Sequence, residues 1–291
     1  MAAFLLPFYA WLLAAVLQPL VLGAQERSFL WKVNQGENSI YLLGSIHYLR
    51  KEHFPLRPSI LDALDQSKRL VLEIDLDSLS PATTQRVTLE KALYGDGTTL
   101  AQNIDPDTYR LAAERAAQLG LDIKVLSPMK PWFVALTMTA FKLRQLGLDS
   151  ALGVDRQLAE RAKRSGKPIN GLETFEFQLD IFDRLSKREQ EMMLRETVAE
   201  LERLDHNIAR IVQAWLDGDG AALEKLMLAG MREYPDLYQR LIVERNRRWL
   251  PEIEKIIAAG GAMVVVGAGH LVGQDGVIEL LKSRGYTLEQ Q

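Results

Sequence analysis

The sequence predicts an α/β fold, because short apolar strand segments alternate with helical segments at both ends of the chain, around a helix-rich middle. Two further observations point to one compact domain. The 291-residue chain is 47% hydrophobic and 25% charged, as globular proteins are. No Pro-, Ser- or Gly-rich linker divides it into independent parts. We therefore expect one α/β domain over residues 25–291, after a separate segment at residues 1–24.

The expected strands are short apolar runs bounded by turn residues. The run RLVLEI, for example, is typical of a parallel strand that is buried on both faces. In chain order, the predicted strands are Ser39–Leu43, Arg69–Ile74, Asp122–Leu126, Pro168–Leu172, Ala262–Val266 and Tyr286–Leu288.

The expected helices follow an apolar period of three to four residues and carry start signals. Asp105-Pro106 is one such start, and Ser186 with Glu189 forms a capping box. We place a helical insertion in the domain at about residues 174–260. The predicted helices are Pro58–Lys68, Tyr109–Leu119, Pro131–Leu146, Val154–Arg164, Ser186–Trp215, Asp219–Met231, Pro235–Ala259 and Gly276–Arg284.

The N-terminal segment has no charged side chain from Met1 to Gln25 and is almost wholly apolar from Phe4 to Leu22. Gly23-Ala24 then resembles a small-residue cleavage site. The apolar run is also about long enough to span a bilayer if it is retained. We predict an exported protein whose segment 1–24 is a signal peptide or an anchor, and which is periplasmic or membrane-anchored facing the periplasm.

Composition excludes several classes of function. The net charge is −3 and no Lys/Arg stripe stands out, so we expect no nucleic-acid partner. The absence of cysteine excludes thiol nucleophiles, disulfides and Cys-ligated metal sites. No Gly-x-Ser-x-Gly elbow is present to suggest a serine hydrolase.

One short element recurs. Gly44-Ser45-Ile46-His47 and Gly267-Ala268-Gly269-His270 each follow an apolar strand, and both have the form Gly-x-x-His. A glycine at the strand exit lets the backbone turn sharply, and the histidine can then fold back over the strand end. Because ligands of open α/β sheets bind outside the carboxyl ends of the strands, neighbouring turns of this kind would place both imidazoles in one cleft.

Glu73 is a third candidate, because a carboxylate within or after an apolar strand is costly unless it is paired or binds a metal. Two histidines and a carboxylate match the ligand set of a catalytic metal centre with open positions. Such a metal would acidify its bound water and polarise a scissile carbonyl. From the residues alone, this shared site and a set of unconnected structural histidines remain open alternatives. His53 and His206, in polar surroundings, are expected to lie outside any site.

The two Gly-x-x-His motifs near opposite ends of the chain, with a glutamate on the second strand, resemble the TraB/PrgY/GumN family. The resemblance covers roughly Leu30 to Leu288. Its supporting segments are Leu30–Val33, Leu42–His47, Gly171–Thr174, Glu244–Asn246 and Trp249.

The resemblance implies metal-dependent proteolysis, as in the related Tiki proteases acting on Wnt, with a divalent ion such as Mn, Co or Zn. It also implies a central mixed sheet flanked by helices, similar to the ChaN and erythromycin-esterase proteins. His47, Glu73 and His270 match the motif residues, as metal ligands and catalytic groups. Arg245 and Asn246 match a polar patch, which implies a role in positioning substrate or oxyanion.

We therefore predict a metal-dependent, peptidase-like hydrolase in which Glu73 is either a metal ligand or the general base. Two alternatives stay open: metal-free, esterase-like hydrolysis, and a haem- or metal-binding protein of ChaN-like fold. The expected partners are a peptide or small-molecule substrate, and a membrane if the N-terminal segment is retained. His47→Ala and His270→Ala are each expected to abolish activity and to leave the fold intact.

Overall fold

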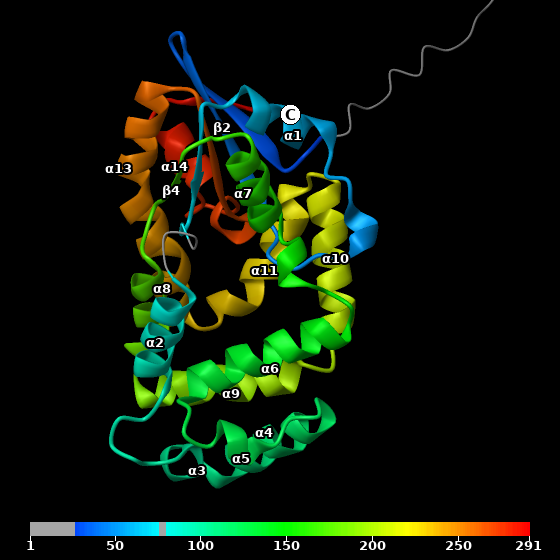
Figure 1. Cartoon of the computed structure of the whole chain (residues 1–291), viewed down its shortest axis with the longest axis vertical. Coiled ribbons are helices and arrows are strands. Elements are labelled where there is room, and N and C mark those ends of the chain that lie inside the picture. The colour runs from blue at the N-terminus through cyan, green and yellow to red at the C-terminus, as the bar shows by residue number, and fades with distance from the viewer. Residues whose placement is uncertain (1–26, 76–79) are drawn as a thin grey trace, which may run out of the picture.

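The computed structural model describes residues 27–75 and 80–291 (Figure 1). The predicted signal peptide or anchor at residues 1–24 lies outside the described residues. In the part of the chain that is described, no helix combines the length and the apolar character needed to cross a membrane. Figure 1 shows a sheet with its covering helices in the upper part of the molecule and a group of helices below.

A six-stranded mixed sheet forms the centre of the upper part, in the order β4-β3-β5-β2-β1-β6. Its parallel members are β2 (Asn38–Ser45), β3 (Arg69–Leu72), β4 (Ile169–Gly171) and β5 (Ala262–Gly267). Two antiparallel strands complete one side, β1 (Leu30–Gln35) and β6 (Thr287–Gln290). The predicted α/β class with a central mixed sheet is confirmed.

The three central strands end at the same level. Strand β5 lies between β2 and β3, and Val265 is in register with Leu43 on one side and Leu72 on the other. These apolar side chains are all buried, as expected for parallel strands covered on both faces. The residues that follow the strands therefore meet at one carboxyl edge.

Two pairs of helices cover the sheet, one on either side in Figure 1. One pair is α1 (Pro58–Gln66) with α7 (Val154–Arg164), and the other is α13 (Glu244–Ala259) with α14 (Val277–Ser283). Helix α13 continues α12 (Pro235–Tyr238) through a π-helical turn, η4 (Gln239–Val243). All of these helices contribute apolar side chains to the main core around the sheet.

The lower group of helices packs around a second apolar core, in which α9 contacts both α4 and α6. Two separate chain segments supply these helices, one before and one after β4. They are α3 (Leu100–Asn103), α4 (Pro106–Gln118), α5 (Ile123–Leu126), α6 (Pro131–Gln145) and α9 (Lys187–Glu200). Helices α2 (Pro81–Ala92) and α8 (Phe175–Asp183) pack against α6 in a small third core. Helices α10 (Leu204–Leu216) and α11 (Gly220–Arg232) pack against the main core instead.

The structure differs from the secondary-structure predictions in several segments. The segment Asp122–Leu126 is the helical turn α5, because the Asp122 side chain accepts from the Lys124 amide and caps it. The capping box at Ser186 is present, but the helix predicted to run through Trp215 breaks between α9 and α10. Strand β1, which pairs with both β2 and β6, lies in a segment for which no strand is predicted, and helices α2 and α8 lie in segments for which no helix is predicted.

Candidate functional site

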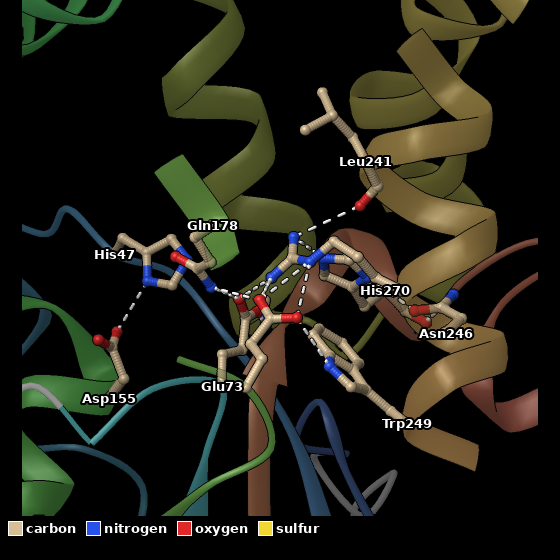
Figure 2. A network of polar contacts seen from close by, with 11 residues as sticks. His47, Glu73, Asp155, Gln178, Leu241, Asn246, Trp249 and His270 are labelled. Atoms are coloured by element: carbon tan, nitrogen blue, oxygen red, sulfur yellow. Dashed lines mark hydrogen bonds and ion pairs between the residues drawn. The ribbon is translucent and has the colours of Figure 1, made fainter. Parts of the chain in front are cut away.

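The carboxyl edge of the sheet gathers the three residues singled out from the sequence. His47 follows β2, Glu73 directly follows β3, and His270 ends the short 3-10 turn η5 (Ala268–His270) after β5. A Cβ atom placed on Gly267 would lie 3.2 Å from Glu73 Oε1, 3.5 Å from His47 Nε2 and 3.7 Å from His270 Cδ2. In Figure 2, Glu73 lies between the two histidines. The structure thus brings all three together.

Glu73 is held by hydrogen bonds to both carboxylate oxygens. Oε1 accepts from the Gly267 amide at 2.6 Å, and Oε2 accepts from Arg245 Nη2 at 2.6 Å and Gln178 Nε2 at 3.0 Å. Burial raises the pKa of this carboxyl, but the neighbouring His270, Arg245 and His47 outweigh burial and bring it to about 2. Glu73 is therefore an ionised, immobilised carboxylate.

His47 is anchored through one ring nitrogen only. Its Nδ1 lies 3.0 Å from Asp155 Oδ1 on α7, and 55% of its side-chain surface is exposed. Surrounding protein lowers the pKa of His47, but the hydrogen bond and charge of Asp155 outweigh this effect and raise it to about 9. No residue of the described chain makes a hydrogen bond to Nε2. This nitrogen is therefore left for a ligand.

His270 is buried and held on both ring nitrogens. Nε2 lies 2.9 Å from Arg245 Nη1, and Nδ1 lies 2.7 Å from Asn246 Oδ1. Because a guanidinium can only donate, Nε2 accepts and the proton stays on Nδ1, which donates to Asn246. Burial, with the positive charges of Arg245 and His47, lowers the pKa of His270 to about 3. The ring packs at 4.5 Å from Trp249 and is neutral.

Arg245 connects Glu73 and His270 to a second glutamate, Glu173. Its Nη2 lies 2.6 Å from both Glu73 Oε2 and Glu173 Oε1, and its Nη1 reaches His270. Trp249 donates from Nε1 to Glu173 Oε2 at 3.0 Å, and its ring lies 4.7 Å beneath the guanidinium. One buried cation therefore compensates two buried carboxylates.

Sequence reasoning had assigned no role to Glu173, Asp155 or Gln178. A signal for Glu173 exists: Leu172-Glu173 repeats Leu72-Glu73 after the adjacent parallel strand, and the Glu173 amide donates to the Glu73 carbonyl at 2.9 Å. Asp155 and Gln178 lie on helices with no distinguishing pattern in the sequence.

The other predicted residues are placed as follows. Asn246 donates from Nδ2 to the His270 carbonyl at 3.1 Å and to the Asp275 carbonyl at 2.8 Å, so it fixes the turn that carries His270. His53 accepts from the Arg50 amide, and His206 is exposed on α10. Neither of these histidines lines the cavities at the carboxyl edge.

The donor set has the chemistry of a metal site but, as arranged, does not offer three free ligand atoms. His270 Nε2 and Glu73 Oε2 both already accept from Arg245. Within residues 27–75 and 80–291, no three His, Asp or Glu side chains are placed to hold one ion. Arg245 thus supplies the positive charge at this point of the network, and its guanidinium would have to withdraw before His270 could bind a metal.

This protein is of the α/β class, with a mixed sheet whose strand ends carry two histidines and two glutamates, and with one arginine that joins both glutamates to His270. The TraB/PrgY/gumN family matches residues 29–290, and the chain belongs to this family.

Similar chains come from several bacteria. One is an uncharacterized protein of Treponema pallidum (strain Nichols), 24% identical over 285 residues that cover 91% of this chain and 83% of the relative. The uncharacterized protein YbaP of Escherichia coli (strain K12) is 24% identical over 251 residues, covering 85% of this chain and 89% of YbaP. YbaP of Shigella flexneri matches over the same length at the same identity. No solved structure matches the chain.

Proposed function

We propose that this protein is a hydrolase that cleaves an amide or ester bond, with Glu73 and His47 acting on water and on the substrate carbonyl. The observation that carries the proposal is the convergence of Glu73 Oε1 and His47 Nε2 around Gly267, because both residues line a cavity of about 620 Å³. Ligand cavities of this size at the carboxyl edge of a parallel sheet are common sites of catalysis.

Glu73 and His47 suit opposite roles, because their surroundings shift their pKa values in opposite directions. The lowered pKa of Glu73 keeps it ionised as a proton acceptor, and the raised pKa of His47 keeps it protonated as a donor. The water oxygen adds to the carbonyl carbon while one water proton passes to the Glu73 carboxylate. His47 Nε2–H donates a hydrogen bond to the oxyanion that forms. When the C–N or C–O bond breaks, the leaving atom takes the proton back from Glu73, so both residues return to their starting state.

Arg245 and Asn246 act through other residues in this proposal. The Arg245 guanidinium hydrogen-bonds to Glu73, Glu173, His270 and the Leu241 carbonyl. Asn246 hydrogen-bonds to the His270 ring and to the backbone carbonyls of His270 and Asp275. Both are therefore positioning residues that hold Glu73 ionised and the His270 turn in place.

Metal dependence is a second candidate, favoured by one observation. The Nδ1 atom of each histidine is held by an oxygen, of Asp155 or Asn246, and this is how metal-binding histidines are commonly oriented. With Arg245 withdrawn, His47, Glu73 and His270 would be the residues to hold a divalent Mn, Co or Zn ion. The transfer of a water proton to Glu73 and the hydrogen bond from His47 to the oxyanion do not depend on this ion.

The test uses purified protein with a panel of fluorogenic peptides and esters, with and without EDTA, beside elemental analysis. Glu73→Gln should lower kcat/KM by about 10²–10⁴-fold, as loss of a general base does. His47→Asn should lower it by about 10²–10³-fold, as loss of an oxyanion donor does. His206→Asn, on the exposed surface of α10, is the matched control and should change nothing.

Undiminished turnover in Glu73→Gln would contradict the proposal. Loss of activity in EDTA, with about one ion per chain that disappears in His270→Ala, would favour the metal-dependent candidate. Haem binding with a Soret band and no turnover would favour the binding-protein alternative instead.

A further inference from the structure

The Ser45 hydroxyl is buried at the centre of the site and has no hydrogen-bond partner in the described chain. Only 2% of the residue is exposed. A buried polar group without a partner costs about 1–3 kcal/mol, so such groups in folded proteins usually have a reason. Tyr94, Thr108 and Trp132 also carry unpaired buried atoms among the described residues, but Ser45 alone of these four lines the cavities at the carboxyl edge.

Two cavities meet at Ser45. The first, of about 620 Å³, extends beneath α6, where Phe133, Leu136 and Ala140 line it. The second, of about 350 Å³, lies among α10, α11 and η4, where Ile211 and Met227 are part of its wall. Ser45, His47, Tyr48, Glu73 and Leu143 line both cavities.

The walls of both cavities away from the shared residues are mainly apolar, and each volume lies in the range of ligand pockets. Apolar cavities gain free energy by enclosing apolar groups, at roughly 25 cal/mol for each Å² removed from water. A molecule that occupies both must therefore carry an apolar group on each side of the shared wall.

We propose that the cleft binds an extended peptide with a large apolar side chain on each side of the scissile bond, and that the Ser45 hydroxyl donates to the scissile carbonyl oxygen. This inference rests on the hydrolase function proposed above. Because Ser45 Oγ has no base within hydrogen-bond distance in the described chain, it is not an activated nucleophile. It completes, with His47 Nε2–H, a pair of donors for the oxyanion.

Four internally quenched peptides test the two cavities. The first contains Gly-Ser-Phe-Leu-Ser-Gly, two others replace Phe or Leu with Ser, and the fourth replaces both. Loss of each apolar side chain should lower kcat/KM by at least about 10-fold, since even one methylene discriminates by about 10–200-fold in an apolar pocket. Equal kcat/KM for all four peptides would overturn the inference.

Matched variants show which cavity binds which apolar side chain of the peptide. Leu136→Asp places a charge in the first cavity and Ile208→Asp places one in the second, and both positions are only partly enclosed. Each should raise KM for the Phe-Leu peptide, and each should act on a different one of the two singly substituted peptides. Leu89→Asp, at an exposed position of α2 that lines neither cavity, is the control.

Ser45→Ala separates substrate binding from a structural role. Because the hydroxyl has no partner to lose, the variant should keep or slightly raise the Tm. Its kcat should fall by about 10²–10³-fold with KM little changed, as on removal of an oxyanion donor. An unchanged kcat, or a fall in Tm that accounts for the lost activity, would overturn the role of Ser45.

Binding of the same peptides to Glu73→Gln, followed by fluorescence, distinguishes this inference from the proposed function. Binding with the predicted side-chain preference, without cleavage by the wild-type protein, would support the two-cavity cleft and contradict the hydrolase. Cleavage of all peptides alike would support the hydrolase and overturn the cleft. Absence of binding by all four peptides would overturn the inference.

Discussion

At the scale of single residues, the contacts of Arg245 are not visible in the chain before it folds. It stands among Glu244, Arg247 and Arg248 in a charged helical stretch, where the ordinary expectation is a surface ion pair. In the structure it is 8% exposed and contacts two carboxylates from two adjacent strands. No local pattern specifies this, because its partners lie about a hundred residues apart in the sequence.

The two motif histidines also differ in ways that the shared motif conceals. His47 is largely open to the cavity, whereas His270 is buried, packs against Trp249 and joins Arg245 to Asn246. The expectation that both alanine variants keep the fold therefore applies to His47 alone.

We predict that His270→Ala lowers the free energy of unfolding by about 2–4 kcal/mol, because it empties a buried site and leaves buried polar groups unpaired. His47→Ala should stay within about 0.5 kcal/mol of the wild type, as exposed substitutions do. Urea unfolding followed by circular dichroism measures both. Equal midpoints for the two variants would show that the His270 contacts add nothing to stability.

At the scale of elements, the glycines of the two motifs are required for reasons other than a sharp turn. Gly44 lies within β2 and Gly267 has an ordinary φ of −53°. A Cβ on Gly44 would come within 2.3 Å of the Phe29 ring, which is itself buried against Trp31. A Cβ on Gly267 would instead intrude among Glu73, His47 and His270. Gly44 leaves space for the Phe29 ring in the core, and Gly267 leaves space for Glu73 and the two histidines at the strand end.

Alanine at these positions should therefore have opposite consequences. Gly44→Ala should lower the free energy of unfolding by about 1–3 kcal/mol, as overpacking does, because the Phe29 ring has no free space to enter. Gly267→Ala should retain the Tm and lose turnover, since its backbone tolerates alanine but its Cβ crowds Glu73 Oε1 at 3.2 Å. Thermal melts and kcat on one substrate separate the two. A destabilised Gly267→Ala with normal kcat would contradict this division.

At the scale of the whole molecule, the sequence predicts the parallel sheet and the site better than it predicts the outer strand and the helical group. β-Branched runs such as Val264–Val266, bounded by glycines, favour buried strands, and the Gly-x-x-His motif that follows this run is then expected at the strand end. Strand β1 has no such signal, since its short alternation becomes a strand only by pairing with β2 and β6. Asp122–Leu126 has strand-like composition, but its aspartate caps a helical turn far from any strand partner.

The pKa shifts at the site predict a stability maximum near pH 6.5. The folded-state pKa of His270 is lowered to about 3, so its neutral form is favoured and stability falls as pH drops from about 6.5 to 3. The pKa of Glu73 is lowered to about 2, so its stabilising effect is present above pH 4.5 and is lost as pH falls towards 2. The pKa of His47 is raised to about 9, so its contribution is present below pH 6.5 and is lost as pH rises through 9.

Thermal melts from pH 4 to pH 9.5 check this profile. His47→Asn should flatten the alkaline side only, and Glu73→Gln should flatten part of the acid side. His206→Asn, on the exposed surface of α10, should reproduce the wild-type curve. An alkaline limb that persists unchanged in His47→Asn would show that another group controls it.

The strand order has a consequence for biosynthesis. Strand β2 forms early in the chain, yet its parallel neighbour β5 is among the last segments to be made, and β6 pairs with β1. Pairings between segments so distant in sequence form slowly, because loop closure precedes any gain from contact. A nascent chain interrupted before residue 262 therefore has His47 and both glutamates but no cleft. The cleft at the carboxyl edge can therefore assemble only after β5 and the turn that carries His270 have been made.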